Sequence, residues 1–299
     1  MNIGMIGIGL MGHGIATNLQ KRGHRLSVLE HPGNRPLDDL IAGGATTHAT
    51  AREVAARSDV VIVCVTGTPQ VEAVVLGVGG ALEGLRSDGI VIDCSTAIPA
   101  STERVAQAVR EAGGRFLDAP MTRTPKEAAE GRLNLLVGGD RDVFEQCLPL
   151  LRCFAENIVY VGPVGAGHRM KLLHNYVSLG SLALLSEAAA CALRAGVAPD
   201  VFVEVLANGG GGGTALERLK PYLLSSDPSA LRFAMSNAQK DLGYYSSMAD
   251  DGGAVHGIAD AVLRTFADAV EQAGPERWVP ELVSLLVQRG AAVGAGTAT

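Results

Sequence analysis

The chain has 299 residues, of which 47% are hydrophobic and 19% charged, and its formal net charge is -6. This length suits about two domains, and the composition is too apolar for an intrinsically disordered protein. Lysines and arginines form no cluster, which argues against nucleic-acid binding, because neutralising phosphates requires clustered cations.

The sequence contains no segment that we expect to enter a membrane. The apolar N-terminus lacks the basic flank of a signal peptide. The most apolar helical stretch, residues 176–193, contains Glu187 and several serines and glycines, which favours a core helix over a membrane span. The five cysteines show no Cys-x-x-Cys spacing, so we expect reduced thiols in a cytoplasmic protein, without a metal site.

The first half of the chain alternates between short β-rich runs and helical stretches. Near-continuous apolar runs such as VVIVCV are typical of parallel strands covered on both faces. The predicted strands are residues 2–6, 25–29, 60–65, 89–92 and 115–117. The predicted helices are residues 11–22, 51–56, 70–76 and 101–112. This alternation predicts an α/β domain, a Rossmann-type doubly wound parallel sheet built from right-handed βαβ units.

The second half has helical periodicity throughout, with no convincing strand after residue 165. The predicted helices are residues 167–195, 199–206, 214–224, 233–250, 258–273 and 279–289. We therefore expect a dinucleotide-binding domain at 1–163 and an all-α domain for substrate binding and dimerisation at 164–299. The glycines at 209–213 suit either a mobile lid or a linker, and the small, polar tail 291–299 is expected to fray.

A glycine motif follows the first predicted strand and opens the first predicted helix. It reads Gly7-Ile8-Gly9-Leu10-Met11-Gly12, a GxGxxG pattern. Gly7 permits a tight turn, Gly9 lets the backbone approach a pyrophosphate, and Gly12 lets helix and strand pack closely. The helix N-terminus offers unpaired N–H groups to the phosphates. We expect this turn to bind the cofactor, with Leu10 and Met11 in contact with it beside the glycines. The alternative is a turn with only a structural role.

An acidic residue follows the second predicted strand at the spacing typical of NAD sites. Glu30 lies 18 residues after Gly12, close to the ~20 residues expected for the acid that binds the adenosine ribose. A carboxylate there repels a 2′-phosphate, so NAD is favoured over NADP. Arg35 could bind that phosphate instead, but we prefer to interpret it as a solvated loop cation.

Three polar residues follow later strands, where open parallel sheets bind ligands. Thr66, after the run 60–65, is expected to contact the cofactor. Ser95 and Thr96 follow the strand 89–92 and suit either the nicotinamide end of the cofactor or the cap of the next helix. Thr96 is the one that we assign to the cofactor.

The predicted substrate loop is Thr122-Arg123-Thr124, just after the strand 115–117. Thr124, Pro125 and Glu127 together form a helix-start signal, a capping box with proline at the first helical position. Arg123 would add a planar fork suited to a carboxylate, phosphate or sulfonate. We expect an anion pocket here, the alternative being a surface cation beside a simple helix cap.

The first predicted helix of the second half has a polar stripe on an apolar background. Its members recur at helical spacing and are Lys171, His174, Asn175 and Ser178. Because buried polar groups need partners, we expect a substrate and a nicotinamide to supply them, rather than a solvated face. His168 and Arg169 are expected to be ordinary solvated residues near the helix start.

Lys171 is the predicted general acid and base. In reduction its ammonium would give a proton to a carbonyl oxygen as hydride arrives. In oxidation the neutral amine would take that proton back. Burial and a nearby cationic nicotinamide would favour the neutral amine.

Five motifs together resemble the β-hydroxyacid dehydrogenase family, which includes 3-hydroxyisobutyrate dehydrogenases, tartronate semialdehyde reductases and sulfolactaldehyde reductases. They are GIGLMG at 7–12, DCSTAIP at 93–99, DAPMTRT at 118–124, GAGHRMKLLHNY at 165–176 and QKDLGY at 239–244. The resemblance covers essentially the whole chain. It implies hydride transfer between NAD(H) and a small anionic 3-hydroxy acid or its semialdehyde, and a homodimer or homotetramer built through the helical domain.

The resemblance also assigns roles to single residues. It implies that Lys171 is catalytic, that Asn175 helps to hold the substrate and that Lys240 lies near cofactor and substrate. The usual loop Ser-Gly-Gly is replaced by residues 122–124, and its arginine is similar to that of sulfolactaldehyde reductases, where it grips a sulfonate. Ser178 matches that branch as well, whereas His174 stands where the branch has asparagine.

Three alternative functions share parts of this pattern. An imine reductase has the same scaffold but usually lacks a lysine at position 171. A decarboxylating 6-phosphogluconate dehydrogenase needs a much longer helical domain. A non-catalytic dinucleotide-binding module used in protein interaction also loses the catalytic lysine, which this chain keeps together with the polar stripe.

Overall fold

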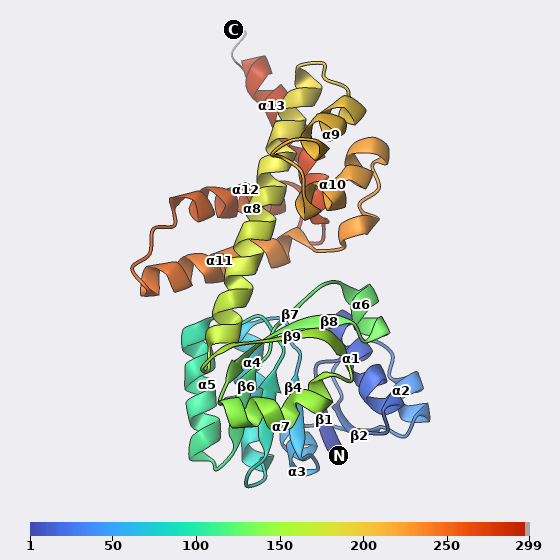
Figure 1. Cartoon of the computed structure of the whole chain (residues 1–299), viewed down its shortest axis with the longest axis vertical. Helices are drawn as coiled ribbons and strands as arrows, with labels where there is room; N and C mark the ends of the chain where they lie inside the picture. Colours follow the sequence, from blue (N-terminus) through green and yellow to red (C-terminus); the bar gives the residue numbers. More distant parts are fainter. Residues whose placement is uncertain (297–299) are drawn as a thin grey trace. The chain divides into compact units, whose positions relative to one another are not determined.

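The computed structural model describes the backbone of residues 1–296 and the side chains of residues 1–290. The chain divides into two compact units, Met1–Lys171 and Leu172–Thr299, which Figure 1 shows in blue to green and in yellow to red. The division falls within a long helix, α8 (Ala166–Arg194). The sequence-based boundary between residues 163 and 164 lies just before that helix.

The first unit contains one sheet whose strands follow the doubly wound order. The strands are β1 (Asn2–Ile6), β2 (Arg25–Leu29), β3 (Thr46–His48), β4 (Val60–Val63), β5 (Ile90–Asp93), β6 (Arg115–Asp118), β7 (Met121–Thr122), β8 (Leu133–Gly139) and β9 (Ala155–Gly162). Their order is β3-β2-β1-β4-β5-β6-β8-β7, with β9 paired to β8. The strands from β3 to β6 are parallel, β8 is antiparallel to β6, and β9 is parallel to β8. The order reverses between β1 and β4, where such sheets bind ligands.

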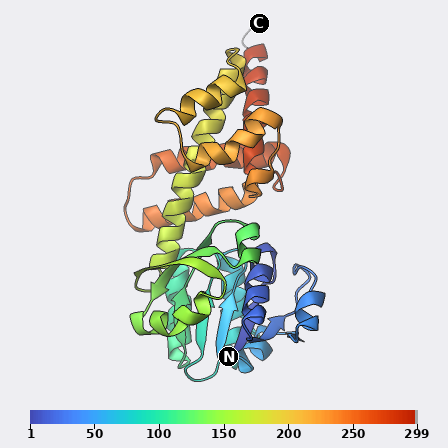
Figure 2. The same ribbon diagram turned by 45° about the vertical axis from the view of Figure 1, so that its right-hand side comes forward.

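Helices cover both faces of this sheet (Figure 2). They are α1 (Leu10–Lys21), α2 (Asp38–Ala42), α3 (Ala51–Ala56), α4 (Thr68–Leu76), α5 (Pro99–Glu111), α6 (Pro125–Glu130) and α7 (Arg141–Leu151). Alternate residues of each strand enter opposite cores. In β4, Ile62 packs with residues of α1, α2, α6 and α7, whereas Val61 and Val63 pack with α3, α4 and α5. This two-faced burial explains the continuous apolar runs and confirms the predicted Rossmann-type sheet.

The outer strands of the sheet were not predicted from the sequence. Strands β3, β7, β8 and β9 and helices α2 and α7 had no predicted counterpart. Strand β9 begins Ala-Glu-Asn and is only partly buried, and α7 contains Pro149. The weak apolar pattern of β9 explains why it was missed. Strand β8 was missed although its Leu133, Leu135 and Val137 alternate and are fully buried.

The second unit is helical, as predicted. Its helices are the remainder of α8, then α9 (Pro199–Ala207), α10 (Thr214–Ser225), α11 (Met235–Asp251), α12 (Gly257–Ala273) and α13 (Leu282–Gly296). Between residues 172 and 296 the only β-type pairing is an isolated bridge, Ala234 with Trp278. Helix α13 extends beyond the predicted 279–289, so the tail expected to fray begins as helix, and residues 297–299 lie outside the described part.

The glycine run 209–213 forms the turn between α9 and α10. The backbone N–H of Gly212 donates to the carbonyl of Gly209 (3.2 Å), and Gly213 has a positive φ of 133°. The turn is thus closed by its own backbone. That it acts as a lid stays a prediction.

Helix α8 is long and apolar enough to cross a membrane by length and composition alone. One such helix is weak evidence, because the core helix of a soluble protein passes the same test. Within its most apolar window 39% of residues are buried, and Leu179 and Leu182 belong to the core of the helical unit. These contacts agree with the interpretation of α8 as a core helix.

A histidine flanked by two carboxylates joins α11 to α12. The Nε2 atom of His256 lies 2.7 Å from Asp250 Oδ1, and its Nδ1 lies 3.0 Å from Asp260 Oδ1. The hydrogen bonds to Asp260 and Asp250 raise the pKa of His256 above its ordinary value. Ser246 also donates to Asp260 Oδ1 (3.0 Å), which keeps that carboxylate in place.

This arrangement predicts a pH-dependent contribution to stability. Because the folded pKa of His256 is raised, its stabilisation should be fully present below the ordinary value of 6.5 and lost as the pH rises through the folded pKa. The Tm of wild type should therefore exceed that of His256→Gln most at about pH 5.5, with the difference shrinking toward about pH 9. A difference that does not change with pH would contradict the ion pairs.

Candidate functional site

The glycine motif forms the turn between β1 and α1, as predicted. Gly7 has φ 94°, and a Cβ on it would lie 2.3 Å from the Cys64 carbonyl oxygen. A Cβ on Gly12 would lie 2.0 Å from the Gly7 oxygen. In contrast, no heavy atom within the described range lies within 4 Å of a Cβ built on Gly9. The fold requires the first and last glycines, while the middle one leaves open space.

That open space suits the pyrophosphate of a dinucleotide. Gly9 is the N-cap of α1, which has no side-chain cap, so its first-turn N–H groups are available to an anion. Leu10 is exposed at the start of the helix and Met11 packs partly against the core. These features fit the predicted cofactor site.

A depression at the end of β2 adjoins this turn. Its lining residues are Glu30, His31, Pro32, Asn34, Arg35, Pro36 and Leu37. Asn34 was not predicted, yet it anchors the loop: its Nδ2 donates to the Leu29 carbonyl (2.8 Å) and its Oδ1 accepts from Ile8 N–H (3.2 Å). The depression therefore presents both a carboxylate and a guanidinium beside the glycine turn.

The loops after β4 and β5 are tied together by a buried serine. The backbone N–H of Val65 donates to Ser95 Oγ (3.0 Å), and Ser95 N–H donates to Asp93 Oδ1 (2.9 Å). The cap alternative is wrong for Ser95 and Thr96, because the N-cap of α5 is Ile98, whose N–H donates to Thr68 Oγ1 (2.8 Å). Thr66 is exposed and Thr96 half-buried on these loops.

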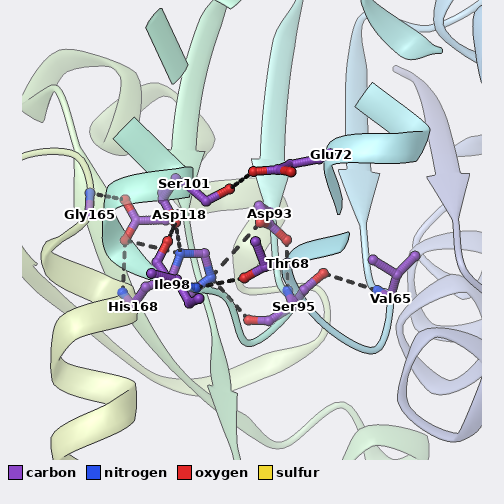
Figure 3. Close-up of polar contacts among 11 residues, drawn as sticks. Val65, Thr68, Glu72, Asp93, Ser95, Ile98, Ser101, Asp118, Gly165 and His168 are labelled. Atoms are coloured by element: carbon purple, nitrogen blue, oxygen red, sulfur yellow. Dashed lines mark hydrogen bonds and ion pairs between the residues drawn. The ribbon is translucent and has the colours of Figure 1, made fainter. Parts of the chain in front are cut away.

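A buried carboxylate at the end of β6 holds the first turn of α8 (Figure 3). Asp118 Oδ1 accepts from Gly165 N–H (2.8 Å), and Oδ2 accepts from His168 N–H (2.9 Å). Asp118 is fully buried, so these charge-assisted bonds satisfy two of the N–H groups that a helix start leaves unpaired. Asp118 opens the motif at residues 118–124, but its sequence context predicts no role for it.

His168 lies beside this carboxylate, fully buried rather than solvated as predicted. Its Nε2 lies 3.1 Å from the Ser95 carbonyl and its Nδ1 2.8 Å from Thr102 Oγ1. The ring lies between Asp93 and Asp118, at 3.9 Å from one oxygen of each. The glycine at 167 explains the burial, since a Cβ there would lie 2.3 Å from the Leu136 oxygen. Arg169 is exposed, as predicted, and pairs with Glu103.

Asp93 is the second carboxylate of this cluster. Burial raises the pKa of Asp93, opposed by its attraction to His168. Its Oδ2 has no hydrogen-bond partner within the described residues. Burying a carboxylate with one unbonded oxygen is energetically unfavourable. The neighbouring imidazole of His168 therefore helps to stabilise Asp93 at this end of the sheet.

The substrate loop has the predicted capping box. Thr124 N–H donates to Glu127 Oε2 (3.0 Å), and Pro125 occupies the first turn of α6. Thr122 is buried in β7, where its hydroxyl accepts from Asn134 Nδ2 (3.1 Å). The two threonines are therefore already engaged by their own chain.

Arg123 does not form the open anion pocket that the sequence predicted. Its guanidinium donates to the Glu156 carboxylate on β9 and to the Arg132 carbonyl. The pairing lowers the pKa of Glu156, so the carboxylate stays charged near neutral pH. Arg123 also has φ 82°, a backbone conformation that favours glycine. This agrees with the glycine that is usual at this position in the family that the motifs resemble.

The polar stripe of α8 is connected to α11 by Asp241. Asn175 Nδ2 donates to Asp241 Oδ2 (2.6 Å), and Lys240 Nζ lies 2.8 Å from Asp241 Oδ1. The structure thus brings Asn175 and Lys240 together, through a carboxylate that the sequence analysis missed. Asp241 is thus a partner of Asn175 within the chain, and the contact of Asn175 with a substrate stays a prediction.

These hydrogen bonds also indicate which ring nitrogen of His174 carries a proton. Because Asn175 Nδ2 must face the carboxylate, its Oδ1 faces His174 Nδ1 (3.0 Å). An amide oxygen only accepts, so Nδ1 carries the proton and, in the neutral ring, Nε2 is an acceptor. Lys171 and Ser178 are half-buried on the same helix.

Two family models match nearly the whole chain. The NAD binding domain of 6-phosphogluconate dehydrogenase matches residues 2–162. The NAD-binding domain of NADP-dependent 3-hydroxyisobutyrate dehydrogenase matches residues 165–286.

Curated relatives and a solved structure agree with these models. The 2-hydroxy-3-oxopropionate reductase of Escherichia coli (strain K12) is 37% identical over 67% of this chain and 68% of the relative. The 3-sulfolactaldehyde reductase of the same organism is 32% identical, over 81% and 80%. The crystal structure of 3-hydroxyisobutyrate dehydrogenase from Salmonella typhimurium superposes with TM-score 0.83 at 25% identity, covering 95% of this chain and 99% of that one. The chain therefore belongs to the β-hydroxyacid dehydrogenase family of NAD(P)-dependent oxidoreductases.

Proposed function

We propose that the chain transfers a hydride between NAD(H) and a small anionic 3-hydroxy acid or its semialdehyde, with Lys171 as general acid and base. The observation that carries the proposal lies in the first turn of α8. That turn is fixed to the end of β6 by Asp118, and Lys171 follows it by one turn. The glycine turn after β1 occupies the same carboxyl edge of the sheet.

In this mechanism, bound NAD(H) supplies or accepts the hydride. As hydride reaches the carbonyl carbon, the Lys171 ammonium gives its proton to the carbonyl oxygen, so the aldehyde gains one hydride and one proton and becomes an alcohol. In the reverse direction the neutral amine takes the hydroxyl proton. Asp118 holds the helical turn that precedes Lys171, and a well-positioned acid of this kind would lower the barrier.

The substrate is proposed to be a short oxo or hydroxy acid. The names of two relatives, a 2-hydroxy-3-oxopropionate reductase and a 3-sulfolactaldehyde reductase, support this class. The residues predicted from the sequence to bind it are 122–124 on the loop and, on α8, His174, Asn175 and Ser178. The anionic group of the substrate could bind the Arg123 guanidinium only if that guanidinium left Glu156. Glu156 would therefore compete with the substrate for Arg123.

NAD is the proposed cofactor because of the charge beside the adenosine ribose. Glu30 is exposed in the depression at the end of β2, and a carboxylate there repels a 2′-phosphate. Arg35 lines the same depression and is the group that would favour NADP. The preference therefore depends on which of the two side chains faces the ribose.

The remaining proposals concern assembly and location. Val177 and Leu184 on α8 are 64% and 73% exposed, which supports a homodimer or homotetramer that covers the helical unit. The five cysteines are free thiols, which supports a reducing, cytoplasmic location.

The principal test removes the proposed acid. Wild type should oxidise NADH with at least one small oxo acid, and Lys171→Ala should lower kcat by about 10²–10⁴-fold, the usual contribution of a positioned acid. NADH affinity, measured by fluorescence titration, should change little. Equal turnover by both proteins would end the proposal, and a wild type inert toward the whole panel would favour a binding module.

The glycine turn offers a matched pair of substitutions. Gly9→Ala places its Cβ in open space, so the protein should fold normally but bind NADH at least about tenfold more weakly, because the pyrophosphate loses its close approach. Gly12→Ala collides with the Gly7 carbonyl and should cost about 1–3 kcal/mol of stability. Calorimetry and NADH titration separate the two effects. Normal NADH binding by Gly9→Ala would place the pyrophosphate elsewhere.

The nucleotide preference can be tested at Glu30. Glu30→Gln removes the repulsion and should raise the ratio of kcat/KM for NADPH over NADH by about tenfold, which corresponds to about 1.4 kcal/mol. Asp38→Asn removes a nearby exposed charge on α2 and serves as the control. Equal ratios in both variants would mean that Glu30 does not face the ribose.

The competition between Glu156 and the substrate predicts a gain of affinity. Glu156→Gln should lower KM for anionic substrates by about threefold or more, because a larger fraction of Arg123 is then available. An uncharged aldehyde should be unaffected. Glu130→Gln is the matched control, since Glu130 pairs with Arg132 in the same region. If both variants behave alike, or if Arg123→Ala leaves KM for anions unchanged, Arg123 does not bind substrate.

A further inference from the structure

The ring of His168 joins three segments that are far apart in the sequence. It belongs to the first turn of α8, its Nε2 faces the Ser95 carbonyl in the loop after β5, and its Nδ1 faces Thr102 on α5. Its own backbone N–H is held by Asp118 at the end of β6. Figure 3 shows Ser95, Asp93 and Asp118 around the imidazole.

The hydrogen bonds allow one orientation of the ring. A carbonyl oxygen only accepts, so Nε2 carries a proton and donates to Ser95. Thr102 Oγ1 can accept from Nδ1 while donating to the Ile98 carbonyl (3.2 Å), or it can donate to Nδ1. Either way both ring nitrogens are satisfied, which fixes the ring in a site with no exposed surface.

The two ends of this connection are the parts that the proposed reaction must bring together. Lys171 is three residues after His168, on the adjoining turn of the same helix. Thr96, predicted to meet the cofactor, directly follows Ser95. A displacement of about 1 Å between such groups costs about 10²-fold in rate.

We propose that His168 is a positioning residue for the hydride-transfer step, which holds the turn bearing Lys171 at a fixed distance from the loop Ser95–Thr96. The inference rests on the proposed function of Lys171. It differs from a packing role, because a residue that only fills space would affect stability and leave kcat unchanged.

The test compares two substitutions of similar size. His168→Gln keeps a donor for the Ser95 carbonyl and an acceptor for Thr102, whereas His168→Leu removes both. We expect kcat to fall about 10²-fold in His168→Leu and to stay within about threefold of wild type in His168→Gln. The Kd for NADH should stay within about threefold in both, because the glycine turn is untouched. The inference is overturned if His168→Leu keeps wild-type kcat, or if His168→Gln is as slow as His168→Leu.

A second variant and a second readout keep the inference testable if His168→Leu fails to fold. Thr102→Val removes the Nδ1 partner and, with it, the contact of the hydroxyl with the Ile98 carbonyl. It should lower kcat by about tenfold, the equivalent of about one hydrogen bond. Thr102→Ser keeps the hydroxyl and should match wild type; equal rates for Val and Ser would contradict the inference. Amide hydrogen exchange of residues 167–171 should be faster in His168→Leu than in His168→Gln. This readout needs no activity, so an inert wild type would sink the proposed function while exchange still tests the role of His168.

Discussion

The structure of the proposed site depends on Asp118, which accepts two backbone N–H groups from the start of α8. A buried carboxylate is unfavourable unless strong donors surround it, and the N-terminus of a helix supplies such donors together with a favourable dipole. The bond therefore satisfies the helix and the carboxylate at once. It also decides where the long helix begins relative to the sheet of the first unit, and so where Lys171 lies on that unit.

Charge compensation within the chain is the second organising feature. Arg123 is paired with Glu156, Lys240 with Asp241, and the imidazole of His168 lies between two carboxylates. Under the proposed function, an anionic substrate that binds Arg123 would have to replace Glu156 as its partner rather than meet a bare charge. His168 is fully buried, so its two neighbouring carboxylates bear on the packing of the helix start and not on a substrate.

Local patterns predicted the glycine turn, the five central strands, the helical second unit and the capping box before α6. Each depends on residues within one element or two adjacent ones. The interactions that were missed join residues far apart, such as Asp118 with His168, Asn175 with Asp241, and Arg123 with Glu156. His168 looked solvated because nothing in its helix reveals that β6 and α5 lie against it. The direction of Arg123 depended on β9, an edge strand whose exposed pattern gave no signal.

The close contact between the start of α8 and the sheet limits how the motif can vary. A Cβ on Gly138 would lie 2.7 Å from Asp118 Oδ1, and one on Gly167 would lie 2.3 Å from the Leu136 carbonyl. Any side chain at either position would push the helix outward and break the carboxylate bonds beneath it. Substitution of either glycine should therefore be strongly destabilising. Arg169, which is exposed between the buried turn and Lys171, can be replaced by other residues. The contrast offers a way to recognise this helix anchor in other sequences.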